Sequence, residues 1–212
     1  MSDLKRLSDA LQKGDVKTVN ALTTQALRTG FSPQQILNEG LIAGMDVIGV
    51  RFKANEIFLP EVLVVARAMH VGLNILKPKL VETGAKPVAK VLLGTVKADL
   101  HDIGKNLVGM MLQGAGFEVI DLGIDVPYAR FVDAVKSNNA QIIAMSALLS
   151  TTMPHMRATI EAIHKAGLAN KVRILVGGAP VTQRYADEIG AHGFAPDAAS
   201  AVDKARELVG AF

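Results

Sequence analysis

Residues 88–104 have the sequence VAKVLLGTVKADLHDIG, and this stretch indicates which class of fold the second half of the chain adopts. Its first part, Val88–Val96, is an almost continuous apolar run, which is typical of a strand buried in a parallel sheet. A helical pattern follows from about Ile103 to Gln113 and ends at a glycine-rich turn. A buried strand, a polar loop and a helix in succession predict one unit of an α/β fold.

Further strands and helices alternate downstream of this unit. The predicted strands are Phe117–Leu122, Gln141–Ser146, Val172–Val176 and Gly193–Ala195, and the predicted helices span about 128–136, 154–166 and 198–209. Five strands with interleaved helices predict a flavodoxin-like, doubly wound five-stranded parallel sheet over residues 85–212. Ligands of such sheets bind beyond the carboxyl ends of the strands, so function is expected in three loops: Lys97–Gly104, Ser146–Thr152 and Gly177–Pro180.

Residues 1–84 have helical rather than strand periodicity. Ser32 precedes a proline and is followed three residues later by Gln35, which predicts a capped helix start. Gly40 and Gly44 lie one turn apart in that helix and would permit close helix approach. With segments 3–12 and 15–28 and a helix from about Pro60 to Leu76, the pattern predicts a four-helix bundle. Residues 77–87 contain two prolines and are predicted to form a linker between the two domains.

Composition excludes several classes of protein. The 212 residues contain no cysteine, so disulfides, iron–sulfur clusters and thiolate zinc sites are ruled out, and a cytoplasmic location is expected. Aromatic residues make up only 4% and the net charge is +3, which argues against nucleic-acid binding. The start of the chain has no signal-like apolar stretch, and no run reaches the roughly 20 apolar residues of a membrane span. Neither a nucleic-acid nor a membrane partner is therefore expected.

The loop after the first strand contains the side chains best suited to chemistry. His101 on such a loop can present one ring nitrogen outward while Asp99 accepts a hydrogen bond from the other, as a carboxylate does behind a metal-bound imidazole. The alternative is that Asp99 caps a helix and His101 is an ordinary surface histidine. A mononuclear metal hydrolase would need more ligands, and the other four histidines are not paired at helical spacing. A single protein nitrogen suits a metal that a macrocycle already surrounds.

These motifs resemble those of cobalamin-binding methyltransferase corrinoid proteins. Asp99-Leu100-His101-Asp102-Ile103-Gly104 is similar to the Asp-x-His-x-x-Gly signature of cobalamin-binding domains, as is its context in Thr95–Lys97 and Asp121–Pro127. Ser146-Ala147-Leu148 and Gly177-Gly178 are similar to the family's Ser-x-Leu and Gly-Gly motifs. Phe52–Pro60 resembles the signature of the helical cap that precedes this domain in methionine synthase. The resemblance covers about residues 35–205.

The resemblance implies a role for each matching residue. His101 would be the lower axial ligand of cobalt, replacing the cofactor's own dimethylbenzimidazole, and Asp99 would hold it. Thr152 would complete a relay in place of the family's serine, although it is equally well interpreted as the N-cap of the following helix. The residues expected to contact the corrin ring or the nucleotide tail are Asp99, His101, Asp102, Ile103, Gly104, Val126, Ser146, Leu148, Ser150, Thr152, Gly177 and Gly178. Phe52 and Leu59 would cover the upper face, with Val62 nearby, although without the family Phe52 and Leu59 are better explained as bundle core.

The resemblance also implies a function. The protein would bind cobalamin, as methylcobalamin, cob(I)alamin or a related corrinoid, and carry methyl groups as a subunit that is not catalytic alone. Its partners would be a substrate-specific methyltransferase, an acceptor methyltransferase using a folate or thiol coenzyme, and a reductive activase. Methanol, methylamines, glycine betaine and aryl methyl ethers all stay open as donors.

Three alternatives to this function differ in what else they require of the chain. The first is a cobalamin-dependent sensor or regulator, although no DNA-binding helix pair is visible in the sequence. The second is an adenosylcobalamin mutase, which needs a large barrel that 212 residues cannot supply. The third is a flavodoxin-type nucleotide enzyme, which would need a phosphate loop after the first strand.

Overall fold

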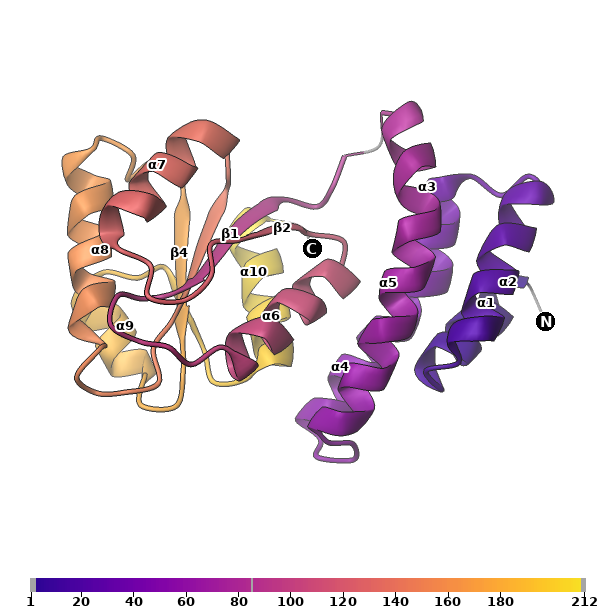
Figure 1. Cartoon of the computed structure of the whole chain (residues 1–212), viewed down its shortest axis with the longest axis horizontal. Coiled ribbons are helices and arrows are strands. Elements are labelled where there is room, and N and C mark those ends of the chain that lie inside the picture. Colours follow the sequence, from indigo (N-terminus) through magenta and orange to yellow (C-terminus); the bar gives the residue numbers. More distant parts are fainter. Residues whose placement is uncertain (1–2, 85, 211–212) are drawn as a thin grey trace. The chain divides into compact units, whose positions relative to one another are not determined.

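The computed structural model describes residues 3–84 and 86–210, which divide into two compact units. The first comprises residues up to 87 together with 113–116, and the second comprises 88–112 and the chain from 117 onward. Figure 1 shows the helical first unit and the α/β second unit. The boundary expected between residues 84 and 85 stays a prediction.

The first unit is a helical bundle, as the periodicity predicts. Its elements are α1 (Asp3–Gln12), α2 (Val16–Arg28), α3 (Pro33–Gln35), the π-helix η1 (Ile36–Ile42), α4 (Ala43–Lys53) and α5 (Leu59–Glu82). Because α3, η1 and α4 follow one another without a break, they form one long helix with a π-helical middle. Ser32 and Gln35 form the predicted capping box at its start.

Two glycines set how closely this long helix packs against α1. A Cβ atom added to Gly40 would lie 2.6 Å from the side chain of Leu7, and one added to Gly44 would lie 2.9 Å from that of Leu11. A larger residue at either position would force the leucine side chain to move, so the two glycines let the helices approach closely. The close approach predicted from the spacing of the two glycines is therefore confirmed.

The predicted end of the last bundle helix is wrong. Instead of ending near Leu76, α5 continues through Pro78 to Glu82. A proline at such a position removes one backbone donor and its ring crowds the carbonyl four residues earlier, so the turn that follows needs other support. An ion pair of 2.9 Å joins Lys79 to Glu82, and the Thr83 hydroxyl donates to the carbonyl of Lys79 at 3.1 Å. Both interactions stabilise the last turn of the helix. The segment between helix and sheet is correspondingly shorter than expected.

The same helix has the length and mean hydropathy of a membrane span. Its 24 residues are apolar enough to cross a bilayer by composition alone. However, one face packs inside the bundle through residues such as Val62, Met69 and Leu76, and the helix carries Glu61 and Arg67. Burial along one face is typical of an amphipathic helix packed in a bundle.

The second unit is a five-stranded, all-parallel sheet with helices on both faces. Its elements are β1 (Lys90–Thr95), α6 (Ile103–Gly114), β2 (Glu118–Asp121), α7 (Tyr128–Asn138), β3 (Ile142–Ser146), α8 (Pro154–Lys165), β4 (Arg173–Gly177), α9 (Gln183–Ile189), β5 (Gly193–Ala195) and α10 (Ala198–Val209). The strand order β2-β1-β3-β4-β5 is that of a flavodoxin-like fold, as predicted. Helices α7 and α8 lie on one side of the sheet, and α6 and α10 on the other (Figure 1).

The sequence analysis missed helix α9. It has only seven residues, of which Ala186 and Ile189 are buried, so it is too short to show a helical period. Its ends are nevertheless well defined. The Thr182 hydroxyl accepts a hydrogen bond from the backbone of Tyr185, and Gly190 ends the helix with φ +75°.

The register of the strands brings the three expected loops together. Thr95 at the end of β1 pairs with Ser146 at the end of β3, and Ser146 pairs with Gly177 at the end of β4. The chain runs from β1 to β2 on one side and from β3 to β4 on the other, so the ends of β1 and β3 form the topological switch point of the sheet. Side chains of β1, β3 and α7, with Phe131 fully buried, pack beneath it. The loops are thus held on a rigid base.

Candidate functional site

The loop between β1 and α6 carries His101 and is bonded at both ends. The backbone N–H of Asp99 donates to the carbonyl of Val96 at 3.2 Å. The hydroxyl of Thr95, which is fully buried, donates to the carbonyl of His101 at 2.8 Å. The loop is therefore attached to the end of β1 at the histidine itself, which limits how far the imidazole can move.

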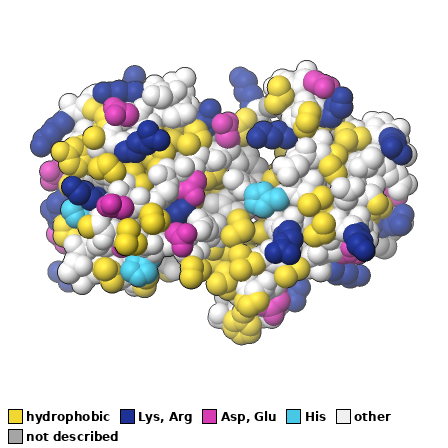
Figure 2. Space-filling view, viewed as in Figure 1, with side chains coloured by type: hydrophobic (Ala, Val, Ile, Leu, Met, Phe, Trp, Pro, Cys, Tyr) yellow, Lys and Arg dark blue, Asp and Glu magenta, His cyan; other side chains and the backbone are white. Residues whose placement is uncertain are grey.

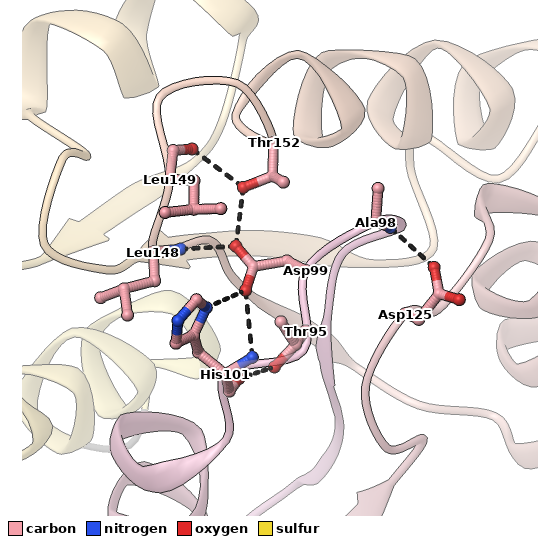
Figure 3. A network of polar contacts seen from close by, with 8 residues as sticks. All are labelled: Thr95, Ala98, Asp99, His101, Asp125, Leu148, Leu149 and Thr152. Atoms are coloured by element: carbon pink, nitrogen blue, oxygen red, sulfur yellow. Dashed lines mark hydrogen bonds and ion pairs between the residues drawn. The ribbon is translucent and has the colours of Figure 1, made fainter.

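Asp99 is the centre of the site. Its side chain is fully buried, yet each carboxylate oxygen accepts two hydrogen bonds. Oδ1 accepts from the ring Nδ1 of His101 at 2.8 Å and from the backbone of His101 at 3.1 Å. Oδ2 accepts from the backbone of Leu148 at 2.7 Å and from the hydroxyl of Thr152 at 2.6 Å. Figure 3 shows these contacts converging from the loops that follow β1 and β3.

These bonds keep the carboxylate ionised. Burial by itself would raise the pKa of Asp99, but the hydrogen bonds from Thr152, Leu148 and His101 outweigh it and hold that pKa well below its usual range. An ionised carboxylate only accepts, so the ring Nδ1 of His101 carries the proton. The lone pair of Nε2 is then available, and among the described residues Nε2 has no hydrogen-bond partner. The imidazole side chain is half-exposed, so it can bind an external group through Nε2.

Thr152 lies against Asp99 and does not cap the following helix. Helix α8 has Met153 at its N-cap position, with no side-chain cap. The Thr152 side chain is buried, and its hydroxyl lies between Oδ2 of Asp99 and the carbonyl of Leu149, 2.8 Å away. The interpretation of Thr152 as an N-cap is therefore wrong, because its hydroxyl lies against the carboxylate instead.

The three predicted site glycines differ in why a glycine stands there. An added Cβ on Gly178 would lie 1.9 Å from the carbonyl oxygen of Ala147, and φ is +124°, so the backbone itself requires glycine. A Cβ on Gly177 would lie 2.9 Å from the carbonyl oxygen of Ala195, which is also too close. At Gly104, by contrast, an added Cβ would meet nothing within 4 Å and φ is not positive. The chain has no need of glycine at 104, which leaves open space beside His101 that suits a bulky ligand.

The other predicted residues of this edge have varied surroundings. Leu148 and Ile103 are 41% and 71% exposed, and Leu100 and Leu149 are 67% and 44% exposed, so the two loops that follow β1 and β3 expose several apolar side chains. Ser146 is half-buried, while Ser150 and Asp102 are exposed. Val126 is buried at 2% exposure in the core beneath the sheet edge, so its side chain packs inside the protein.

Three residues of the first unit were expected to cover the cofactor. Phe52, in the last turn of α4, and Leu59, the first residue of α5, are half-buried. Val62 is fully buried in the bundle. That these three residues cover the upper face of cobalt stays a prediction.

Sequence reasoning missed Asp125 and Ala98, which join two loops at this edge. Among the described residues, four other than glycine have positive φ, and two of them, Asn55 and Asn139, lie at helix ends where asparagine tolerates it. Ala98, at φ +64°, and Asp125, at φ +50°, lie at no helix end. Such a conformation costs an alanine about 1 kcal/mol. The backbone of Ala98 donates to Oδ1 of Asp125 at 2.6 Å, and a bond to a charged group contributes about 1.5–3 kcal/mol, enough to offset that strain.

The charges of the surface show no concentration on the face seen in Figure 2. Lys and Arg side chains are scattered over it, with acidic side chains between them. Nor do the described residues, 3–84 and 86–210, contain three His, Cys, Asp or Glu side chains grouped so that they could hold a metal ion. The two loops offer one free imidazole nitrogen and several exposed apolar side chains, which suits a metal whose other coordination positions are filled by a cofactor.

Comparison with known proteins places these features in a family. A B12 binding domain family matches residues 89–204, and a second family, also described as a B12 binding domain, matches residues 3–77. The chain is 44% identical over 208 residues to the dimethylamine corrinoid protein of Methanosarcina barkeri, with 97% of each chain covered. It is 41% identical to a corrinoid protein of Desulfitobacterium hafniense, with 99% of each covered.

Solved structures show the same two-part architecture. A cobalamin-binding protein from Desulfitobacterium hafniense DCB-2 matches 98% of this chain and 99% of its own, at a TM-score of 0.82 and 32% identity. The methanol:cobalamin methyltransferase complex of Methanosarcina barkeri contains a chain that matches 99% of this one over 80% of its length, at a TM-score of 0.86 and 28% identity. With both family matches and relatives aligned along nearly its whole length, this chain belongs to the B12-binding corrinoid proteins of methyltransferase systems.

Proposed function

We propose that this protein is a methyl carrier that holds a corrinoid through His101 and passes methyl groups between two methyltransferases. A bound corrinoid supplies the cobalt that carries the methyl group. The observation that carries the proposal is the geometry of one imidazole. Nδ1 of His101 is 2.8 Å from the buried Asp99 carboxylate, and Nε2 is left with its lone pair outward. This is the orientation that a lower axial ligand needs.

The chain's own residues divide the work of binding. Asp99 fixes the tautomer of His101, and the Thr152 hydroxyl and the backbone of Leu148 fix Asp99 in turn. Leu100, Ile103 and Leu149 offer the apolar surface that the face of a large macrocycle would cover, although they are exposed in this chain. Because Nδ1 is held by Asp99 whatever Nε2 binds, the imidazole can ligate and release without leaving its place.

Phe52 and Leu59 are proposed to shield the upper face of the cofactor. Their half-buried aromatic and aliphatic side chains would exclude water from the methyl group. The donor enzyme is proposed to be a methylamine methyltransferase, because two relatives that are 44% and 43% identical to this chain along 97% of its length are dimethylamine corrinoid proteins. We place the protein in the cytoplasm, where the acceptor methyltransferase and a reductive activase would be its other partners.

The axial ligand is tested by the absorption spectrum of protein reconstituted with cobalamin. His101→Ala should shift the spectrum of the bound cofactor toward that of cobalamin without a lower nitrogen ligand, at equal cobalt content. His164→Ala is the matched control, since His164 lies in the last turn of α8 and takes no part in the site. Identical spectra for His101→Ala and the wild type at full occupancy would refute the assignment.

The donor is tested by supplying the loaded protein with methyltransferases for monomethylamine, dimethylamine, trimethylamine and methanol in turn. Methylation of the bound corrinoid should be fastest with the dimethylamine enzyme. Fastest methylation with the methanol enzyme would contradict the proposed donor, while leaving the role as a carrier intact.

A further inference from the structure

The loop between β2 and α7 contributes one carboxylate to the conformation of the histidine loop. Asp125 accepts a hydrogen bond from the backbone of Ala98 at 2.6 Å, and its own backbone donates to the carbonyl of Asp99 at 3.0 Å. The two loops are thus joined by a reciprocal pair of bonds, one through a side chain and one through the backbone. Figure 3 shows Asp125 reaching Ala98 from a different segment than the one that carries Thr152.

The bonds on either side of this pair are all between backbone atoms. Val126 donates to the carbonyl of Thr95 at 3.0 Å, and Val96 and Val126 form a parallel bridge. Any residue at these positions other than proline would make the same bonds. The contact from Ala98 to Asp125 is the one bond of this set that depends on the type of side chain.

The position of Ala98 gives this contact its consequence. Ala98 is the residue before Asp99, so its φ and ψ angles set the direction in which the Asp99 side chain leaves the backbone. At φ +64° that side chain reaches Leu148, Thr152 and His101 at once. An alanine prefers the right-handed or extended regions, and a change to either would turn the Asp99 carboxylate away from these partners.

We propose that Asp125 is a positioning residue for the axial ligand: its carboxylate holds Ala98 in the left-handed conformation and thereby aims Asp99 at His101. Asp125 acts through two other residues and touches neither the imidazole nor its outward nitrogen. That His101 is a cobalt ligand rests on the proposed function. The effect of Asp125 on the orientation of His101 does not, because that orientation can be measured without cobalt.

The first test uses the protein without cofactor, labelled with ¹⁵N. In Asp125→Ala, the backbone amide of Leu148, which donates to Asp99, should exchange with solvent at least about tenfold faster, since its acceptor is no longer held in place. The imidazole of His101 should change from the Nδ1–H tautomer to a mixture of tautomers. Exchange at Leu92, in the middle of β1, should stay as in the wild type and so show that the sheet is intact.

Two further variants separate positioning from general loss of stability. Ala98→Gly/Asp125→Ala should recover part of the Leu148 protection, because glycine adopts a positive φ without strain. Asn139→Ala is the matched control, since it places an alanine at another left-handed position, at the end of α7, and should leave the His101 tautomer unchanged. Should Asp125→Ala fail to fold, Asp125→Ser provides the same comparison with a side chain too short to reach Ala98.

Wild-type exchange at Leu148 and a pure Nδ1–H tautomer in Asp125→Ala would overturn the inference. So would a double variant that is no better protected than the single one. The cobalamin spectrum of His101→Ala addresses the axial ligand separately. If that spectrum were unchanged while Asp125→Ala altered the tautomer, the proposed function would fail and the positioning role of Asp125 would stand.

Discussion

An Asp99→Asn substitution turns one oxygen of the buried carboxylate into an NH₂ group without changing the shape of the side chain. Each oxygen of Asp99 accepts two hydrogen bonds. In either orientation of the amide, its NH₂ group, itself a donor, therefore faces two groups that donate to Asp99 in the wild type. With the NH₂ toward Oδ2's partners, the Thr152 hydroxyl can turn to the carbonyl of Leu149, but the backbone of Leu148 is left unpaired. With the NH₂ toward His101, the backbone of His101 is left unpaired while the ring can change tautomer.

We expect the second orientation, in which the amide oxygen keeps the hydrogen bonds from Leu148 and Thr152 and the ring, after its change of tautomer, accepts from the NH₂ group. One buried donor left without a partner costs about 1–3 kcal/mol, and the remaining bonds lose the strength that the charge gave them. We therefore expect a loss of about 2–4 kcal/mol in the free energy of unfolding. We also expect the ring proton to move to Nε2, which would abolish the free lone pair.

Urea unfolding followed by tyrosine fluorescence measures this loss. The only two tyrosines, Tyr128 and Tyr185, both lie in the second unit, so the signal reports on the unit that contains Asp99. Asp102→Asn is the matched control, because Asp102 is exposed and its side chain has a single partner, Asn106, at 3.1 Å. That variant should stay within about 0.5 kcal/mol of the wild type.

The loss should also depend on pH with a definite sign. The pKa of Asp99 is lowered from its ordinary value of 3.8, so the stability that the carboxylate contributes is complete above that value and is lost as the pH falls through the lowered pKa. The difference between wild type and Asp99→Asn should thus be constant near neutral pH and shrink in acid below about pH 4. A variant as stable as the wild type at pH 7, or one that keeps its proton on Nδ1, would refute this account of the site.

Three more predictions concern residues in or near the same sheet. Thr152→Val should lower the free energy of unfolding by about 1 kcal/mol or more by leaving one buried acceptor short of a donor, and Thr152→Ser, which keeps the hydroxyl, should not, as measured by urea unfolding. Gly178→Ala should lower the free energy of unfolding of the apoprotein by several kcal/mol, because its Cβ would clash with the carbonyl of Ala147. Gly104→Ala, by contrast, should leave the stability unchanged or slightly raised but weaken cobalamin binding in a titration. Equal affinity of Gly104→Ala and the wild type would exclude a ligand beside Gly104. Desolvation and the neighbouring positive charges lower the pKa of His192, whose ring nitrogen accepts a backbone hydrogen bond, so wild-type stability should fall as the pH drops through about 6.5. In His192→Asn, which keeps an acceptor, the urea midpoint should depend less on pH between 7.5 and 5.5. A midpoint that depends on pH as in the wild type would exclude this histidine as the cause.

Much of the fold follows from patterns among neighbouring residues. The apolar run at Val88–Val96 and the capping box at Ser32 are both local patterns of this kind, and both correspond to elements of the structure. Helix α9 has no such pattern, because seven residues span only two turns and bury only two side chains. Pro78 misled the prediction for a related reason, since a proline indicates a helix end only when nothing else supports the next turn.

The site is predictable to the extent that its residues lie close together in sequence. Asp99 and His101 are two residues apart, and their contact follows from that spacing. Thr152 is 53 residues from Asp99, so its role depended on resemblance rather than on any local pattern, and only the paired ends of β1 and β3 bring it near. Asp125 gave no signal, because its effect comes from the backbone angle of Ala98, which no side-chain pattern encodes.

Groups of the protein itself donate all four hydrogen bonds to Asp99, so the position of His101 is set before any cofactor binds. If the loop that carries His101 became ordered only on binding, the entropy lost in that ordering would lower the affinity for the cofactor. Here the protein already pre-organises the imidazole, so if His101 is the ligand as proposed, binding of a corrinoid would require little rearrangement of the β1–α6 loop. Uptake should then be governed by the cofactor's own detachment of its base, and a corrinoid that lacks a coordinating base should enter faster than complete cobalamin.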